Sequence, residues 1–167
     1  FANFGSLVVP PGSGFALQSR GGLFTFARAH PNRLEPRKRP LQTIIPAFMK
    51  RDHLRIGFGV MGGWNQPQAH AQVVSNIVDH GLNLQQALEA PRFAKLTFDG
   101  LDVMLESRFP KDVRDALARR GHEIDLQGDF SNMMSGGQAV MRDERAKVNS
   151  GASDPRKDGA AVPEPIL

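Results

Sequence analysis

The clearest pattern of polar and apolar positions lies in residues 53–61, which alternate along the chain. Successive side chains of a β-strand point to opposite faces, so this alternation predicts a strand with one buried face. The apolar side chains share one parity: Leu54, Ile56, Phe58 and Val60. Gly62 and Gly63 follow directly and end the predicted strand.

Two helices are predicted to follow this strand. Residues 68–79 carry an apolar stripe at helical spacing, and Gly81 suits the end of that helix. Asn83 can cap the next helix, with Gln86 at the reciprocal position of a capping box, and Pro91 stops it. Each helix has one apolar face, which we expect to cover a sheet.

Further elements are predicted in the second half of the chain. They are strands over 101–105, 122–126 and 138–141, and a helix from Pro110 to Arg120. The order of strands, helices, and then strands and a helix again favours an α+β fold over a run of βαβ units. We expect helices on one face of a mainly antiparallel sheet.

The N-terminal third is rich in glycine and proline, which predicts short strands joined by turns. Residues 7–9 and 15–17 flank a turn-forming run at 10–14, and this arrangement predicts a hairpin. Residues 43–49 are mostly apolar on both parities. They predict a strand buried on both faces, with Pro46 at a bulge or an edge position.

Length and composition bound the class of protein. The 167 residues suffice for one domain with a core, which we place at 1–158, followed by a poorly ordered tail at 159–167. No apolar run approaches the length of a membrane span. The chain opens at Phe1 without a targeting signal, so we expect it to begin within a longer protein.

Charge and titratable residues exclude several kinds of site. The net charge is +4, but the main basic cluster, at 33–39, lies among prolines without interleaved aromatic residues. This favours a solvated loop, or a contact with an acidic partner chain, over nucleic-acid binding. There is no cysteine, and the five histidines lack metal-ligand spacing, so we expect no metal site. Asp99, Asp102 and Glu106 show no acid–base pairing, and residues 133–137 are either a flexible loop near a pocket or packing at the edge of the core.

Four segments together carry a resemblance to a known family. They are residues 4–15 (Phe-Gly-Ser and Gly-Ser-Gly-Phe), 38–46 (Lys-Arg-Pro-Leu-Gln-Thr-Ile-Ile-Pro), 58–93 (Phe-Gly-Val-Met-Gly-Gly, Gln-Pro-Gln, Asp-His-Gly and Ala-Pro-Arg-Phe) and 151–156 (Gly-Ala-Ser-Asp-Pro-Arg). In this order and spacing they resemble the small subunit of gamma-glutamyltransferases, from Phe4 to about Asp158.

The resemblance implies an N-terminal-nucleophile hydrolase with a four-layer αββα sandwich, of which this chain supplies part. In that family a precursor cleaves itself into a large and a small subunit. The new N-terminal Thr of the small subunit attacks a gamma-glutamyl carbonyl, with its own amine as the base. The acyl group then passes to water, an amino acid or a peptide. No metal or organic cofactor is implied, and the large subunit of the same precursor is the implied partner.

The family pattern places the nucleophilic Thr upstream of Phe4. Thr25, Thr43 and Thr97 are the threonines present, and none is N-terminal. We therefore expect a chain that is inactive alone, as a component of a gamma-glutamyl hydrolase or transferase acting on glutathione and related amides. The alternative is a non-catalytic fragment or assembly partner. The compartment stays open between periplasmic or secreted and cytoplasmic.

Gly62 and Gly63 match the oxyanion pair of the family that the chain resembles. A tetrahedral oxyanion needs backbone N–H groups aimed at it, and glycine lets the backbone come close. The alternative is an ordinary turn between strand and helix that needs glycine for its dihedral angles. The resemblance favours the oxyanion hole.

Four further residues fall at positions where the family binds its substrate. Gln42 and Thr43 stand where classical members have two serines that contact the α-carboxylate, or they are a polar pair at the start of a strand. Arg20 and Leu23 stand where those members have a Gln and an Asp, and that Asp pairs with the α-ammonium group. Leu23 cannot do so, whereas Arg20 suits a carboxylate. This points to an acylase of glutaryl or cephalosporin-like amides, with a solvated loop residue as the alternative for Arg20.

Overall fold

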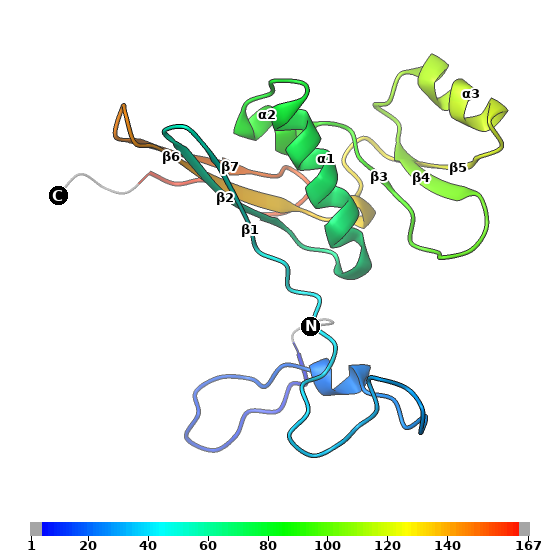
Figure 1. The fold of residues 1–167 in the computed structure, drawn as a ribbon, viewed down its shortest axis with the longest axis vertical. Coiled ribbons are helices and arrows are strands. Elements are labelled where there is room, and N and C mark those ends of the chain that lie inside the picture. Colours follow the sequence, from blue (N-terminus) through cyan, green and yellow to red (C-terminus); the bar gives the residue numbers. More distant parts are fainter. Residues whose placement is uncertain (1–4, 164–167) are drawn as a thin grey trace. The chain divides into compact units, whose positions relative to one another are not determined.

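The computed structural model describes residues 5–163, so the predictions that fall on Phe1 to Phe4 and on residues 164–167 lie outside the described residues. The chain divides into two compact units, Phe1–Thr43 (unit 1) and Ile44–Leu167 (unit 2). Unit 2 holds the strands and α-helices (Figure 1), and the α+β class is confirmed there. Of the described residues, none belongs to a helix long and apolar enough to cross a bilayer.

Unit 1 consists mainly of turns around one short 3₁₀ helix, η1 (Arg20–Leu23). The predicted hairpin is present only as paired backbone without regular strands. The Ser6 amide donates to the Leu17 carbonyl at 2.8 Å, and the Leu17 amide donates to the Val8 carbonyl at 2.8 Å. The turn is closed by the Ser13 amide, which donates to the Pro10 carbonyl at 3.1 Å.

The main sheet of unit 2 has four antiparallel strands in the order β1-β2-β6-β7. The strands are β1 (Ala47–Arg51), β2 (Leu54–Val60), β6 (Gly137–Asp143) and β7 (Val148–Ser153). The alternating segment is confirmed as β2. Strand β7 was not predicted, because its sequence is mostly Gly, Ser and Asn and has no apolar alternation.

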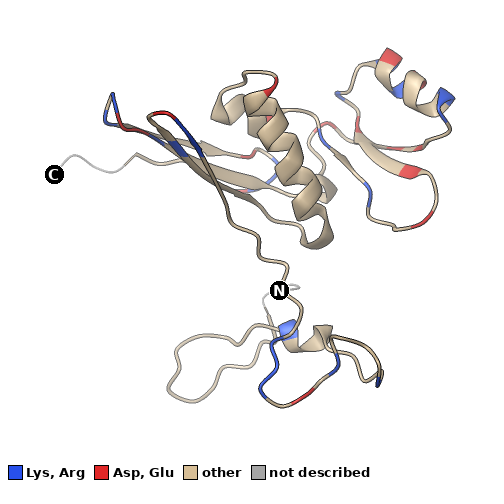
Figure 2. Ribbon diagram, in the orientation of Figure 1, with Lys and Arg blue, Asp and Glu red and all other residues tan. Residues whose placement is uncertain are grey.

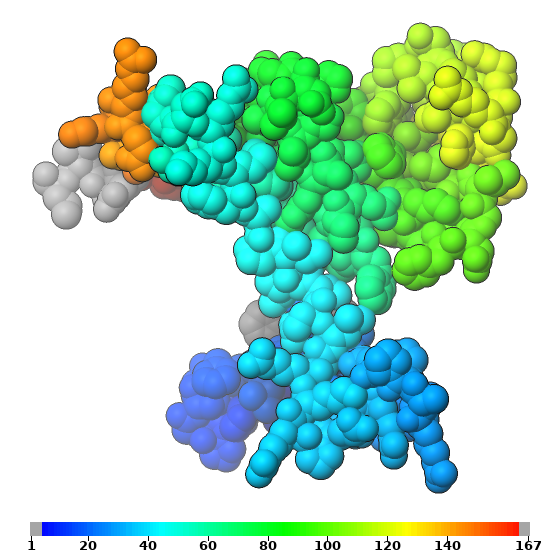
Figure 3. Space-filling view, viewed as in Figure 1, coloured from blue at the N-terminus to red at the C-terminus, as the bar shows by residue number. Residues whose placement is uncertain are grey.

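One face of this sheet is covered by two helices, α1 (Gln66–Val78) and α2 (Leu84–Glu89). The predicted capping box is present, since Asn83 accepts from the Gln86 amide and Gln86 accepts from the Asn83 amide. Figure 3 shows the two helices, in green, as a continuous surface beside the cyan strands. The buried core between helices and sheet consists of Ile56, Phe58, Val60, Ala69, Val73, Leu84, Leu88, Ala139 and Ala152.

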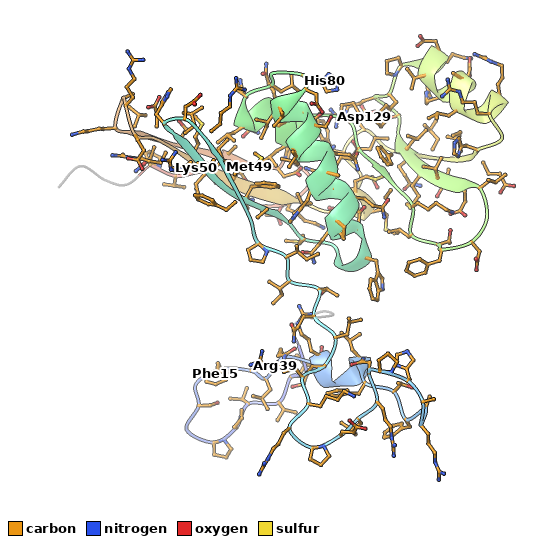
Figure 4. The ribbon with its side chains drawn as sticks, in the orientation of Figure 1. Phe15, Arg39, Met49, Lys50, His80 and Asp129 are labelled. Carbon is orange, nitrogen blue, oxygen red and sulfur yellow. The ribbon has the colours of Figure 1, made fainter. Side chains whose placement is uncertain are left out.

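The opposite face of the sheet is not covered in the same way. Phe48, Gly57 and Val140 lie in register across three strands, and Phe48 and Val140 are 69% and 65% exposed. Figure 4 shows the side chains of this sheet, with Met49 and Lys50 labelled on β1. The strand predicted over 43–49 begins only at Ala47, and among residues 5–163 no second layer covers its outer face. Its burial on both faces stays a prediction.

A second sheet contains β3 (Phe93–Ala94), β4 (Asp102–Glu106) and β5 (Glu123–Gln127) in the order β3-β4-β5. Strands β4 and β5 are parallel, and α3 (Lys111–Arg119) connects them. This single βαβ unit differs from the expectation of an antiparallel arrangement, because a strand pair joined through a helix can run parallel. Figure 2 shows that α3 carries both acidic and basic residues.

The end of the described chain returns to the main sheet. Residues 158–163 form no helix or strand. A hollow on the outer face is lined by Phe48, Gly57 and Val140 together with residues 160–163. The poor order expected of the tail, and the single domain expected over 1–158, stay predictions.

Candidate functional site

The chain leaves β2 through a glycine turn and enters α1 by a short 3₁₀ helix, η2 (Gly63–Asn65). Gly62 has φ 129° and Gly63 has φ 58°, so both glycines occupy backbone conformations that other residues rarely adopt. Neither the Gly62 nor the Gly63 amide donates a hydrogen bond to any residue within 5–163. The turn therefore presents two adjacent, unused N–H groups, and the positive end of α1 follows them.

A loop from another part of the sequence, residues 134–137, supports this turn and is called the supporting loop below. The Met61 amide donates to the Gly136 carbonyl at 3.1 Å, and the Asn65 side-chain nitrogen donates to the Ser135 hydroxyl at 3.2 Å. A Cβ added to Gly62 would overlap the Ser135 hydroxyl and lie 2.8 Å from the Ser135 Cβ. Residues 135–137 are buried, and Met134 is fully buried. Of the two roles left open for this segment, packing is the one that the structure shows.

His70 holds the strand end that leads into the glycine turn. Its Nε2 accepts a hydrogen bond from the Val60 amide at 2.9 Å, and its ring lies 5.2 Å from that of Phe58. Burial lowers the pKa of His70, and the bond from Val60 requires an unprotonated Nε2. His70 is thus a neutral, structural histidine.

Four buried charged residues form a network behind the supporting loop. The Arg92 guanidinium lies 2.6 Å from Asp154, and the Arg156 guanidinium lies 2.6 Å from Glu106 and 3.0 Å from Asp154. All four residues are at most 3% exposed. Ion pairs this deep need additional hydrogen bonds to offset desolvation.

The network also binds the backbone around the supporting loop. Arg92 donates to the Met134 carbonyl at 3.2 Å, and Asp154 accepts from the Gly137 amide at 3.0 Å. The network thereby fixes both ends of the segment that lies on Gly62. Burial acts to lower the pKa of Arg156, but its bonds to Glu106 and the charge of Asp154 outweigh burial and raise that pKa.

Sequence reasoning missed this network, although part of the signal was present. Arg92, Asp154 and Arg156 lie in the segments that carry the family resemblance, but their spacing gives no hint of mutual contact. Glu106 was grouped with Asp99 and Asp102, which lie elsewhere. Asp102 is a surface residue whose partner is Lys95, at 2.8 Å.

The four candidate substrate residues lie in unit 1. Arg20 donates to the Thr43 hydroxyl at 2.8 Å, and both residues are buried. Arg20 is therefore not a solvated loop residue. Leu23 is half-buried and Gln42 is exposed. Within the described part of the chain, no group of three or more His, Cys, Asp or Glu residues could hold a metal ion.

Comparison with known proteins gives a consistent result. The profile of the gamma-glutamyltranspeptidase family matches residues 2–164. A glutathione hydrolase-like proenzyme of Bacillus subtilis is 36% identical over 168 aligned positions, which cover 97% of this chain and 31% of the relative. The chain thus spans about a third of the length of such relatives.

Two solved structures share the fold. The cephalosporin acylase of Bacillus halodurans is 44% identical, with a TM-score of 0.85, over 99% of this chain and 31% of that one. A mutant gamma-glutamyltranspeptidase of Pseudomonas nitroreducens is 28% identical, with a TM-score of 0.77. In this second case the match covers 98% of this chain and 89% of the solved chain, so the two chains have similar extents.

Proposed function

The chain belongs to the gamma-glutamyltranspeptidase family, and we propose that it is one component of an enzyme that hydrolyses or transfers the acyl group of gamma-glutamyl amides such as glutathione. In this proposal the nucleophile is an N-terminal Thr supplied upstream of the described residues. Its hydroxyl attacks the amide carbonyl and its α-amine takes the hydroxyl proton. The C–N bond then breaks, the leaving amine takes that proton, and the acyl group stays on the Thr oxygen as an ester. Water or an amine acceptor attacks this ester, and the Thr oxygen leaves and regains a proton.

The glycine turn is the observation that carries the proposal. Attack on a carbonyl moves negative charge onto its oxygen, and fixed N–H donors lower the energy of that state more than that of the substrate. The amides of Gly62 and Gly63 are adjacent and unused within residues 5–163, and they precede α1. We assign them the role of oxyanion donors.

A second candidate substrate class is favoured by unit 1. Arg20 is buried and donates to Thr43, and we assign its positive charge to the end of the acyl chain. Leu23 offers no carboxylate for an α-ammonium group. An acyl group with a terminal carboxylate and no amine, such as a glutaryl group, fits this pair better. The fold relative that is named a cephalosporin acylase is consistent with this alternative.

The remainder of the precursor is the proposed partner, and the outer face of the main sheet is its docking surface. Gly59 is the next-to-last residue of β2 and lies on that face, with φ outside the left-handed region and no atom within 4 Å of an added Cβ. Glycine weakens a strand interior and often marks the close approach of another backbone. Since no described residue approaches Gly59, the approaching layer belongs to the large subunit in this proposal.

The test is turnover by the complete precursor on two matched chromogenic amides, γ-glutamyl-p-nitroanilide and glutaryl-p-nitroanilide, which differ only in the α-amine. A preference of at least tenfold in kcat/KM for either amide identifies the substrate class. Gly62→Ala is expected to lower kcat by about 100- to 1,000-fold, as for loss of an oxyanion donor. Gly128→Ala is the control, because Gly128 has open space and no left-handed φ. A processed, assembled protein that cleaves neither amide would leave only the non-catalytic assembly role.

A further inference from the structure

The Gly62–Gly63 turn needs an external support to keep its conformation. Both glycines have positive φ, and glycine has more accessible conformations than any other residue. A donor pair acts on a transition state only if its direction is fixed before the reaction. The residues that touch the turn therefore bear on catalysis, although they would not touch the substrate.

Asn65 contacts the turn through its backbone. Its amide donates to the Gly62 carbonyl at 3.1 Å. The peptide unit between Gly62 and Gly63 is planar and trans, so its carbonyl and its N–H point in opposite directions. Fixing the Gly62 carbonyl toward Asn65 therefore directs the Gly63 N–H away from the helix.

The side chain of Asn65 joins this turn to Ser135. It is 1% exposed, and its nitrogen donates to the Ser135 hydroxyl at 3.2 Å. Its side-chain oxygen has no hydrogen-bond partner among residues 5–163. Burying a carboxamide with few bonds carries a desolvation cost, so the position of Asn65 calls for an explanation.

Ser135 has a backbone conformation that only glycine adopts readily. Its φ is 71° and its ψ is −168°. The position is held from both sides, by the Arg92 bond to the Met134 carbonyl and the Asp154 bond to the Gly137 amide. Glycine would fit this backbone without strain, so the presence of serine indicates that the hydroxyl is used.

From these contacts we propose that Ser135 and Asn65 are positioning residues, which clamp Gly62 and aim the Gly63 amide. The Ser135 side chain packs on the α-carbon of Gly62, and Asn65 binds both Ser135 and the Gly62 carbonyl. The inference rests on the proposed function of the glycine turn. It adds two side chains on which the rate depends without contact with the substrate.

Ser135→Gly in the complete precursor tests the clamp. This variant removes the hydroxyl but suits the backbone, so the relief of strain offsets the lost bond to Asn65 and the melting temperature is expected to stay close to that of the parent protein. With γ-glutamyl-p-nitroanilide or glutaryl-p-nitroanilide, whichever the parent cleaves, kcat is expected to fall by about 10- to 100-fold at nearly constant KM. Asn65→Ala, which removes the bond to Ser135 without adding a charge, is expected to show the same split between kcat and KM in its folded fraction.

Lys147→Gly is the matched control. Lys147 also has a positive φ, 56°, but lies in the turn between β6 and β7. The Lys147→Gly variant is expected to leave kcat unchanged. Unchanged kcat in Ser135→Gly, or a loss of kcat explained by a smaller folded fraction, would overturn the proposal.

Hydrogen exchange at the Asn65 amide tests the clamp independently of any enzymatic activity. That amide bonds to the Gly62 carbonyl, so a loosened turn is expected to exchange about tenfold faster in Ser135→Gly than in Lys147→Gly. Faster exchange in a protein that cleaves neither amide would support the clamp and reject the enzyme. Equal exchange in the two variants would reject the clamp whatever the activity.

Discussion

The two faces of the main sheet differ sharply in exposure, although neighbouring residues of one strand point to them in turn. On β2, Ile56, Phe58 and Val60 point to the helices and are at most 7% exposed. Gly57 and Gly59 lie on the other face, and Gly57 is in register with the exposed Phe48 of β1. One face is completed by this chain, and the other offers small residues and uncovered apolar side chains.

The difference in exposure means that one face contributes to the stability of this chain, whereas the other is available for assembly. Burying a large apolar side chain contributes about 1.5–3 kcal/mol, which the helix-covered face already realises in this chain. Phe48 and Val140 are each more than 60% exposed, so they contribute little burial free energy in this chain. Substitutions on the covered face should therefore destabilise the chain, whereas those on the outer face should affect docking.

The largest effect is expected from the charged network at the end of the covered face. Glu106→Gln leaves Arg156 with one carboxylate fewer in a fully buried site, and we expect a loss of about 3–5 kcal/mol in unfolding free energy. Chemical denaturation measures it. The same change at Glu144, 3.7 Å from Arg142 and half exposed, is the control and should cost below about 0.5 kcal/mol. Equal losses for both variants would contradict the network's role.

A direct comparison of the two faces uses Leu88→Ala and Val140→Ala. Leu88 is 0% exposed in the core, so its truncation should cost about 2–5 kcal/mol. Val140 is 65% exposed, so Val140→Ala should lower the unfolding free energy of the isolated chain by less than about 0.5 kcal/mol. Denaturation midpoints of the isolated chain check both values. If Val140→Ala lost as much unfolding free energy as Leu88→Ala, the outer face would already be covered.

Gly59→Val tests the outer face as a docking surface. A Cβ added at Gly59 meets no atom of the described chain within 4 Å, so we expect the melting temperature of the isolated chain to change little. If another layer packs against Gly59, assembly with the rest of the precursor should weaken by about 5- to 150-fold, because overpacking costs about 1–3 kcal/mol. Gly128→Val is the control for assembly. Normal assembly of the Gly59 variant would place the partner elsewhere.

The smallest effect is expected from pH, which acts on the covered face through His70. Burial lowers the pKa of His70 below its ordinary value of 6.5. The unfolded chain then binds more protons, so stability is full above about pH 6.5 and falls as the pH drops toward the lowered pKa. Each unit of pKa difference is worth about 1.4 kcal/mol. His70→Gln should flatten this part of the stability profile, which chemical denaturation at several pH values measures.

Much of the fold of unit 2 follows from local patterns. The alternation of β2, the capping box at Asn83 and the apolar faces of α1 and α2 each depend on nearby residues, and all were predicted with small errors at their ends. Strand β7 was missed because pairing with β6, and not its own side chains, makes it a strand. The apolar segment at 43–49 predicted a strand that begins too early, since β1 starts only at Ala47, and the described residues do not cover its outer face.

The candidate site divides in the same way. The sequence by itself determined the glycine pair after β2 and, through its motifs, membership in the family. Only the tertiary structure decided that Ser135 lies on Gly62, that Arg92, Glu106, Asp154 and Arg156 share one buried network, and that Arg20 is held by Thr43. Dihedral preferences and periodicity are local and can be read from neighbouring residues. The contacts join residues up to 73 positions apart and form only when the core brings their strands and loops together.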